Sequence, residues 1–172
     1  QLVASLRQQG WTGGIDLIGD EPWLPYHRPP LSKTFLAEDK TIDDILIRPA
    51  SAYEKADVVT HLGCRVTAID PSAMSVTLHN GSTLQGSHIV IATGGFPRRL
   101  PIPGAELSGV HVLRNASDVY AIKESAKRSR SVAIIGGGYI GLETAASLRK
   151  LGLEVTLLEA EERVLARVTG PE

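Results

Sequence analysis

The 172-residue sequence contains one cysteine, Cys64, and one methionine. A lone cysteine excludes an intramolecular disulfide and a metal site built from cysteines of this chain. Its apolar runs are short, and none approaches the roughly 20 residues that a membrane-spanning helix needs. The chain also starts without a secretory signal pattern. These absences favour a soluble protein of the reducing cytoplasm that does not associate with membranes.

Charge of one sign is not in excess either. Lys and Arg number 18, Asp and Glu number 19, and the formal net charge is −1. Such a chain lacks the overall basic field that attracts nucleic acids or anionic membranes. With 42% hydrophobic and 22% charged residues, its composition is that of an ordinary globular domain. We therefore expect no nucleic-acid partner.

The two ends lack the usual signals of a domain boundary. The stretch "QLVASLRQQG" has a helical pattern from its first residue, without Met or an N-cap. The stretch "EERVLARVTGPE" stops without a closing element. We interpret the chain as an internal part of a longer protein.

Local patterns predict a mixture of helices and strands. A hairpin is expected around Asn80-Gly81, because this dipeptide tolerates the positive φ of a tight turn. The proline-rich stretch at 96–104 predicts a linker, so we expect a second domain to start near residue 111. The other expected elements are helices at 1–9, 49–56 (Pro49 at the first helical position) and 116–128, a helical turn at 31–38, strands at 15–19 and 132–135, β-rich segments at 57–70, and a buried strand at 88–95.

The most specific pattern is G-x-G-x-x-G, formed by Gly136, Gly138 and Gly141. An apolar strand precedes it, a helix follows that ends at Gly152, and "LEVTLLE" gives a second strand. In such a unit the first glycine permits the tight turn, the second lets a pyrophosphate approach, and the third lets helix and strand pack closely. The pyrophosphate then lies on the N–H groups of the helix start. The pattern predicts a dinucleotide site; a βαβ unit without ligand is the alternative.

Glu159 ends the second strand of this unit. A carboxylate there accepts hydrogen bonds from the 2′- and 3′-hydroxyls of an adenosine ribose and repels a 2′-phosphate. We therefore expect NADH rather than NADPH. Arg163 follows closely and could help to bind a phosphate, which is the alternative.

A similar geometry is expected near the start of the chain. The helical stretch 1–9, a glycine turn and a strand end in Asp20 and Glu21, which could face another adenosine ribose. An acidic pair after a strand is otherwise a solvated turn. The stretch "IVIATGG" favours the ligand interpretation, because small residues after a strand let a ligand come close to the backbone.

The loop "PYHRPPLSK" at 25–33 places Arg28 and Lys33 around three prolines. It is either a rigid surface connector or a preorganised binding site for an electron-rich ligand. No cysteine lies in or just after it, which excludes a dithiol relay there. Cys64 is interpreted as a small, buried apolar residue rather than a redox centre. The five histidines show no metal-ligand spacing, so no metal is expected.

Together, "RPPLSK", "ATGGFPR" and "GGGYIGLE" resemble the FAD-dependent, NADH-using ferredoxin reductases of oxygenase systems, such as the putidaredoxin, rubredoxin and biphenyl-dioxygenase ferredoxin reductases. The resemblance runs over essentially the whole chain. It implies an α/β fold with two Rossmann-like FAD- and NAD(P)-binding domains, each with a parallel sheet and helices in three layers, plus a β-meander. Residues 1–110 would be the FAD domain without its first strand and glycine turn, and 111–172 the first half of the NAD domain.

The resemblance also implies roles for individual residues. Lys33 would lie beside the flavin and pair with Glu143, and these two would be the catalytic residues. A buried lysine stays charged when a carboxylate pairs with it. The other implied FAD-binding residues are Asp20, Glu21, Arg28, Val66, Thr93, Gly94 and Arg114. The implied NAD-binding residues are Gly136, Gly138, Tyr139, Ile140, Gly141, Glu143 and Glu159.

The expected function follows from this resemblance. NADH would pass electrons through FAD to a [2Fe–2S] ferredoxin or a rubredoxin that feeds an oxygenase; the chain alone is expected to be inactive. A second possibility is a flavoprotein similar to apoptosis-inducing factor, which shares the lysine motif and acts mainly through binding and assembly. A third is a degenerate nucleotide-binding module that holds no flavin.

Overall fold

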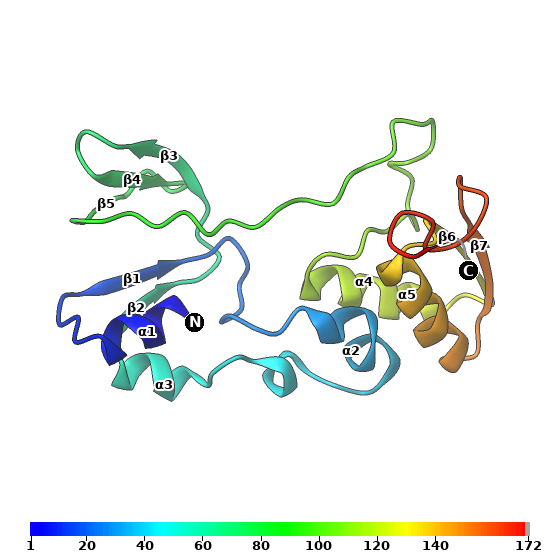
Figure 1. Cartoon of the computed structure of the whole chain (residues 1–172), viewed down its shortest axis with the longest axis horizontal. Helices are drawn as coiled ribbons and strands as arrows, with labels where there is room; N and C mark the ends of the chain where they lie inside the picture. Colours follow the sequence, from blue (N-terminus) through cyan, green and yellow to red (C-terminus); the bar gives the residue numbers. More distant parts are fainter. Residues whose placement is uncertain (171–172) are drawn as a thin grey trace. The chain divides into compact units, whose positions relative to one another are not determined.

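The computed structural model describes residues 1–170 and divides the chain into two compact units (Figure 1). The first unit comprises residues 1–26 and 46–94, and the second comprises residues 27–45 and the chain from residue 95 onward. These two units are defined by contacts within this chain. The predicted boundary between 110 and 111 instead concerns the domains of a larger fold. The domain assignment therefore stays a prediction, and its last two residues lie outside the described part.

The first unit is built on a pair of parallel strands. In this pair Ile15 faces Val58 and Ile18 faces His61. Helix α3 packs against β2, which shields the buried Val58. Pro49 caps α3 instead of occupying its first helical position, a small correction to the prediction. The elements are α1 (Leu2–Gln8), β1 (Ile15–Ile18), α3 (Ala50–Lys55) and β2 (Val58–His61).

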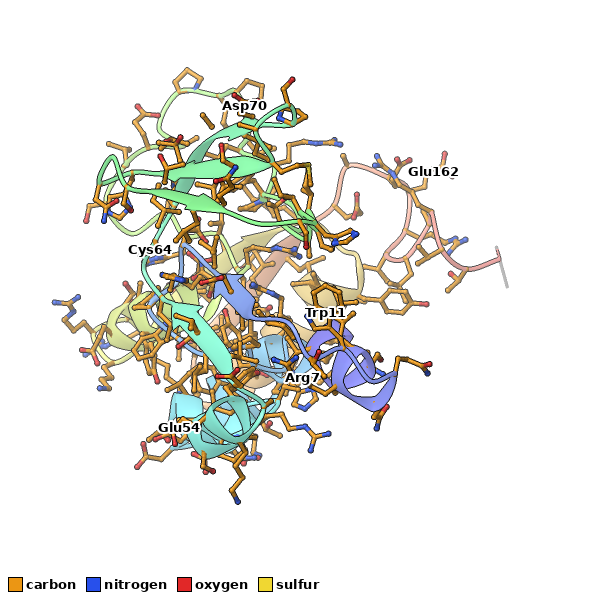
Figure 2. The ribbon with its side chains drawn as sticks, turned by 90° about the vertical axis from the view of Figure 1, so that its left-hand side faces the viewer. Arg7, Trp11, Glu54, Cys64, Asp70 and Glu162 are labelled. Atoms are coloured by element: carbon orange, nitrogen blue, oxygen red, sulfur yellow. The ribbon has the colours of Figure 1, made fainter. Side chains whose placement is uncertain are left out.

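Arg7 joins the ends of α1 and α3. Its guanidinium donates to the carbonyl oxygens of Ala56 at 2.8 Å, Trp11 at 2.7 Å and Gly13 at 2.8 Å. Figure 2 shows Arg7 and Trp11 beside each other at the end of α1. Carbonyls of a helix end and of a turn lack helical partners, and one arginine satisfies several of them.

An antiparallel meander follows, made of β3 (Val66–Asp70), β4 (Ser75–Leu78) and β5 (Thr83–Gln85). The hairpin expected at 75–86 is confirmed, with Thr77 opposite Thr83. Gly81 has a φ of +86°, and Asn80 accepts a hydrogen bond from the N–H of Ser82 at 3.0 Å. The Asn-Gly pair thus supplies the turn that the sequence pattern indicated.

The predicted buried strand at 88–95 is wrong. This segment has no regular secondary structure in the part of the chain that the structure describes, and Val90 and Ile91 are 64% and 68% exposed. A buried strand needs neighbours for its backbone groups, and neither β1 nor β2 pairs with this segment. The apolar pattern indicated a strand, but it carries no information on which neighbouring strand would pair with it.

In the second unit, α4 (Ala116–Ala126) and α5 (Tyr139–Lys150) both pack against α2 (Thr34–Ala37), as Figure 1 shows. Buried apolar side chains form the core of this unit. Phe35 and Tyr120 meet edge to face, with ring centroids 5.5 Å apart. Helix α4 starts with a capping box, because Asn115 accepts from the N–H of Asp118 and the Asp118 carboxylate accepts from the N–H of Asn115. The most deeply buried side chains of this core are Leu31, Phe35, Leu36, Ala116, Val119 and Leu148.

The predicted strand–turn–helix–strand unit is confirmed in full. Strands β6 and β7 are parallel, with Ser131 opposite Glu154 and Ile135 opposite Leu158. Helix α5 connects them, and Gly152 leaves it with a φ of +91°, which is the predicted C-terminal glycine. The second unit contains η1 (Pro29–Ser32), α2 (Thr34–Ala37), η2 (Ile42–Ile45), α4 (Ala116–Ala126), β6 (Ser131–Ile135), α5 (Tyr139–Lys150) and β7 (Glu154–Leu158).

The fold class is thus α/β, with parallel strand pairs and an antiparallel meander as predicted. Its finer description, two Rossmann-like domains in three layers, stays a prediction. Among residues 1–170, no helix has the length and apolar character needed to cross a membrane.

Candidate functional site

The glycine turn between β6 and α5 needs glycine at two positions for the fold itself. Gly136 has a φ of +109°, where other residues are strained. A Cβ on Gly141 would lie 1.9 Å from the carbonyl oxygen of Gly136, so α5 leaves the strand too closely for any side chain. The predicted roles of these two glycines in the turn and in helix packing are confirmed.

Gly138 differs from its neighbours, because the fold does not require a glycine there. Its φ is −79°, and a Cβ would meet no heavy atom within 4 Å. It caps α5, whose next residues are Tyr139 and Ile140, both more than half exposed. The first N–H groups of a helix lack intrahelical acceptors, so this end is suited to an anion. Binding of a pyrophosphate by these residues stays a prediction.

Glu159 closes the same turn from the end of β7. Its Oε2 accepts from the N–H of Gly137 at 2.6 Å, and its Oε1 accepts from the N–H groups of Ala160 at 2.7 Å and Glu161 at 3.0 Å. These hydrogen bonds, the one from Glu161 foremost, hold the pKa of Glu159 below its usual value. A carboxylate oxygen has further lone pairs for ribose hydroxyls. The group is thus ionised and fixed in orientation.

Two arginines follow Glu159, and the structure separates their roles. The guanidinium of Arg163 donates to the carbonyl and hydroxyl oxygens of Thr169 at 2.7 and 2.9 Å. Arg167 donates instead to Glu161, at 2.8 and 3.0 Å, and its charge also lowers the pKa of Glu159. Arg167 is therefore the arginine whose charge reaches the carboxylate of Glu159, whereas the sequence pointed to Arg163.

Lys33 and Glu143 meet, as predicted. The Nζ of Lys33 lies 3.1 Å from Oε1 of Glu143, although 110 residues separate them in the sequence. Their side chains are 51% and 30% exposed, so the expectation of a buried lysine is wrong for this structure. The ion pair connects the proline-rich loop to the helix that follows the glycine turn. Its position beside a flavin stays a prediction.

Two serines that the sequence reasoning missed complete this cluster. The hydroxyl of Ser32 donates to Oε2 of Glu143 at 2.6 Å. The hydroxyl of Ser147, one helical turn after Glu143, donates to the carbonyl oxygen of Ser32 at 2.7 Å. Both serines are buried. The position of Ser147, four residues after the predicted Glu143, was the available signal, because such residues share a helix face.

The predicted FAD-side residues are divided between the two units. In the first unit, Asp20 accepts from Arg65 at 3.4 Å and Glu21 accepts from the hydroxyl of Tyr26. In the second, Arg28 donates to the carbonyl oxygen of Arg114 at 2.9 Å. Val66, Thr93 and Gly94 also belong to the first unit, the last two on the irregular segment 88–95. A common FAD groove for these residues stays a prediction.

Cys64 lies between β2 and β3 (Figure 2), where its thiol faces the carbonyl oxygen of Leu62 at 3.5 Å. It is partly exposed, whereas the sequence suggested a buried residue. No group of three or more His, Cys, Asp or Glu side chains within residues 1–170 has the geometry to hold a metal ion.

A strand, a glycine turn, a helix and a second strand followed by a carboxylate form the arrangement that dinucleotide-binding βαβ units share. The comparison with known families agrees. The chain belongs to the family of pyridine nucleotide-disulphide oxidoreductases, whose sequence profile matches residues 2–172. Members of this family are oxidoreductases that depend on FAD and NAD(P).

Similar curated proteins are ferredoxin reductases. The ferredoxin–NAD(P)⁺ reductase of Sphingomonas sp. is 48% identical over 170 residues, which cover 99% of this chain and 41% of that protein. Putidaredoxin reductase of Pseudomonas putida is 38% identical over 174 residues, which cover 99% of this chain and 41% of that protein. This chain therefore spans about two fifths of the length of these relatives.

Solved structures give the same result. The ferredoxin reductase of the CYP199A2 system from Rhodopseudomonas palustris superposes with a TM-score of 0.94 at 37% identity, over 99% of this chain and 42% of that one. Putidaredoxin reductase in its covalent complex with putidaredoxin gives a TM-score of 0.88 at 40% identity, over 98% of this chain and 42% of that one.

Proposed function

We propose that this chain is the coenzyme-binding part of a flavoprotein that passes electrons from NADH through FAD to a ferredoxin or rubredoxin, which in turn feeds an oxygenase. The observation that carries the proposal is the ion pair of Lys33 and Glu143. It joins a cysteine-free loop to the helix that follows the glycine turn, so this loop presents a lysine paired with a carboxylate and no dithiol.

The residues present fit both cofactors. Gly138 leaves open space at the start of α5, and Glu159 is fixed for a ribose, which supports NADH binding there. Arg28 and Lys33 supply the positive charge that favours an electron-rich ligand, and Asp20 follows β1 at a position suited to a second ribose. FAD, when bound, accepts a hydride and releases single electrons, which no side chain of this chain does. Lys33 would favour its reduced form electrostatically.

The names of the relatives support the electron acceptor. The relatives include putidaredoxin reductase and rubredoxin–NAD⁺ reductase, and one solved structure holds a reductase together with putidaredoxin. Segment 25–40 carries no cysteine, which argues against transfer to a disulfide substrate.

The test uses the full-length product of the gene that encodes this chain. Its visible spectrum should show a flavin band, NADH should bleach that band faster than NADPH, and a ferredoxin or rubredoxin should reoxidise it. Absence of flavin would overturn the proposal. Bleaching by NADH without transfer to any such acceptor would favour a binding and assembly role similar to that of apoptosis-inducing factor.

A further inference from the structure

The carboxylate of Glu143 has two partners, one on each oxygen. Oε1 receives the ammonium of Lys33 at 3.1 Å, and Oε2 receives the hydroxyl of Ser32 at 2.6 Å. Because both donors come from consecutive residues of one loop, the orientation of the carboxylate and that of the lysine depend on each other. If Lys33 were the only partner, the carboxylate could turn and present either oxygen to the ammonium group.

Ser147 fixes the loop that carries both donors. Its hydroxyl donates to the carbonyl oxygen of Ser32 at 2.7 Å and lies 3.4 Å from that of Lys33. Ser147 and Glu143 lie on one face of α5, four residues apart. This helix face therefore bonds the loop at two points, through Glu143 and through Ser147. Ser32 is 5% exposed and Ser147 is 6% exposed, and the hydrogen bond between them is shielded from water.

Few other charged side chains line the groove beside the ion pair of Lys33 and Glu143. The groove beside it has a volume of about 290 Å³ and is lined by residues of α2, α5 and the loop. Its remaining charged side chains are Glu38 and Lys150, which lie 3.7 Å apart. The hydrogen bond from Ser32 is the largest cause that lowers the pKa of Glu143, ahead of the contributions of Lys33, while partial burial raises it.

We propose that Ser32 and Ser147 are positioning residues of the reductase: Ser147 locks the loop onto α5, and Ser32 orients Glu143 so that its second oxygen holds Lys33. The consequence for flavin reduction rests on the function proposed above. We call the contacts among Ser32, Lys33, Glu143 and Ser147 the clamp. The clamp does not depend on the proposed function, because all of its contacts are observed within the second unit.

The clamp is tested first without any cofactor, in the 172-residue chain. The ¹³Cδ resonance of Glu143, assigned by its loss in Glu143→Gln, reports the pKa of this carboxyl during a pH titration. Ser32→Ala should raise that pKa, Ser147→Ala should shift it in the same direction, and Ser32→Thr should restore it. Ser129→Ala is the matched control, since the Ser129 hydroxyl also donates to a backbone carbonyl at 2.8 Å, that of Ser125 on α4, away from Glu143.

A purely structural role of the serines predicts a different result. Ser32→Ala would then lower the melting temperature while the pKa of Glu143 stays at its wild-type value, and the proposal would be overturned. Circular dichroism of each variant separates loss of fold from loss of the hydrogen bond. Should Ser147→Ala fail to fold, Ser32→Ala and Ser32→Thr still decide between the two roles.

The second test follows flavin reduction by NADH in the full-length gene product. Ser32→Ala should slow the reduction step by about tenfold, since small misplacements of reacting groups cost up to roughly a hundredfold. The double variant Ser32→Ala/Lys33→Ala should be no slower than Lys33→Ala, because Ser32 acts through the lysine. Additive effects would overturn the positioning role. A wild-type protein that NADH does not reduce would instead refute the proposed function, and the titration would still decide on the clamp.

Discussion

Glu159 and Gly137 are joined by a hydrogen bond of 2.6 Å, from the backbone N–H of the glycine to Oε2 of the carboxylate. The residue predicted to bind a ribose thus also holds the turn that is predicted to bind a pyrophosphate. A Cβ on Gly137 would lie 2.9 Å from the same oxygen, so the approach is tight. Changes at Glu159 should therefore affect both halves of the site.

Glu159→Gln should weaken NADH binding by about tenfold to a hundredfold, because a hydrogen bond to a charged group contributes about 1.5–3 kcal/mol. NADPH binding should fall less, since the repulsion of its 2′-phosphate is removed. Isothermal titration of the full-length protein with each coenzyme measures both affinities. Glu154→Gln, at the exposed start of β7, is the matched control, and an equal loss for both coenzymes would contradict the assignment of Glu159 to the ribose.

Acid should destabilise the second unit partly through Glu159. Its pKa is lowered in the folded protein, so its stabilising contribution is complete above the pKa of an unfolded glutamate, about 4.3, and is lost as pH falls through the lower folded value. Melting temperatures between pH 7 and pH 3 should fall less steeply below pH 4.5 in Glu159→Gln than in the wild type. If the melting temperatures of the variant and the wild type fell in parallel with pH, protonation of Glu159 would not contribute to acid destabilisation, which would contradict this prediction.

The glycines of the turn should separate fold from ligand binding. Gly141→Ala places its Cβ against the carbonyl of Gly136 and should cost about 3 kcal/mol or more. Gly138→Ala meets open space and should cost at most about 1 kcal/mol through the weaker cap, yet should weaken NADH binding clearly. Urea denaturation and NADH titration measure the two effects. A Gly138→Ala protein that binds NADH like the wild type would remove the pyrophosphate role of this residue.

The success of sequence-based prediction depended on how local each feature is. The turn around Gly136 and Gly141 was predictable because strand, glycines and helix follow one another, and their spacing fixes the geometry. The strand at 88–95 was predicted from an equally clear apolar pattern and is wrong, because burial of a strand depends on neighbours distant in sequence.

Contacts between residues distant in sequence could not be predicted from local patterns. The pairing of Lys33 with Glu143 came from a family resemblance, since no local pattern connects residues 110 positions apart. The hydrogen bond from Ser147 to Ser32 spans 115 positions and was missed. The helix spacing places Ser147 on the face of Glu143, but nothing in the sequence shows that its hydroxyl bonds the carbonyl of Ser32. Arg167 was missed for a related reason: its charge acts on Glu159 through a loop whose path the sequence does not specify.

That loop leads to a last prediction, on coenzyme choice. Arg167 donates twice to Oε1 of Glu161, and its charge already reaches Glu159. Neutralising Glu161 should release this guanidinium for the 2′-phosphate of NADPH, which arginine binds through paired hydrogen bonds. Glu161→Gln should therefore improve NADPH binding severalfold relative to NADH. The double variant Glu161→Gln/Arg167→Ala should lose this gain, and Glu162→Gln, the adjacent exposed carboxylate, should not show it. A gain that survives removal of Arg167 would mean that the lost negative charge alone is responsible, and would contradict a direct role of this arginine.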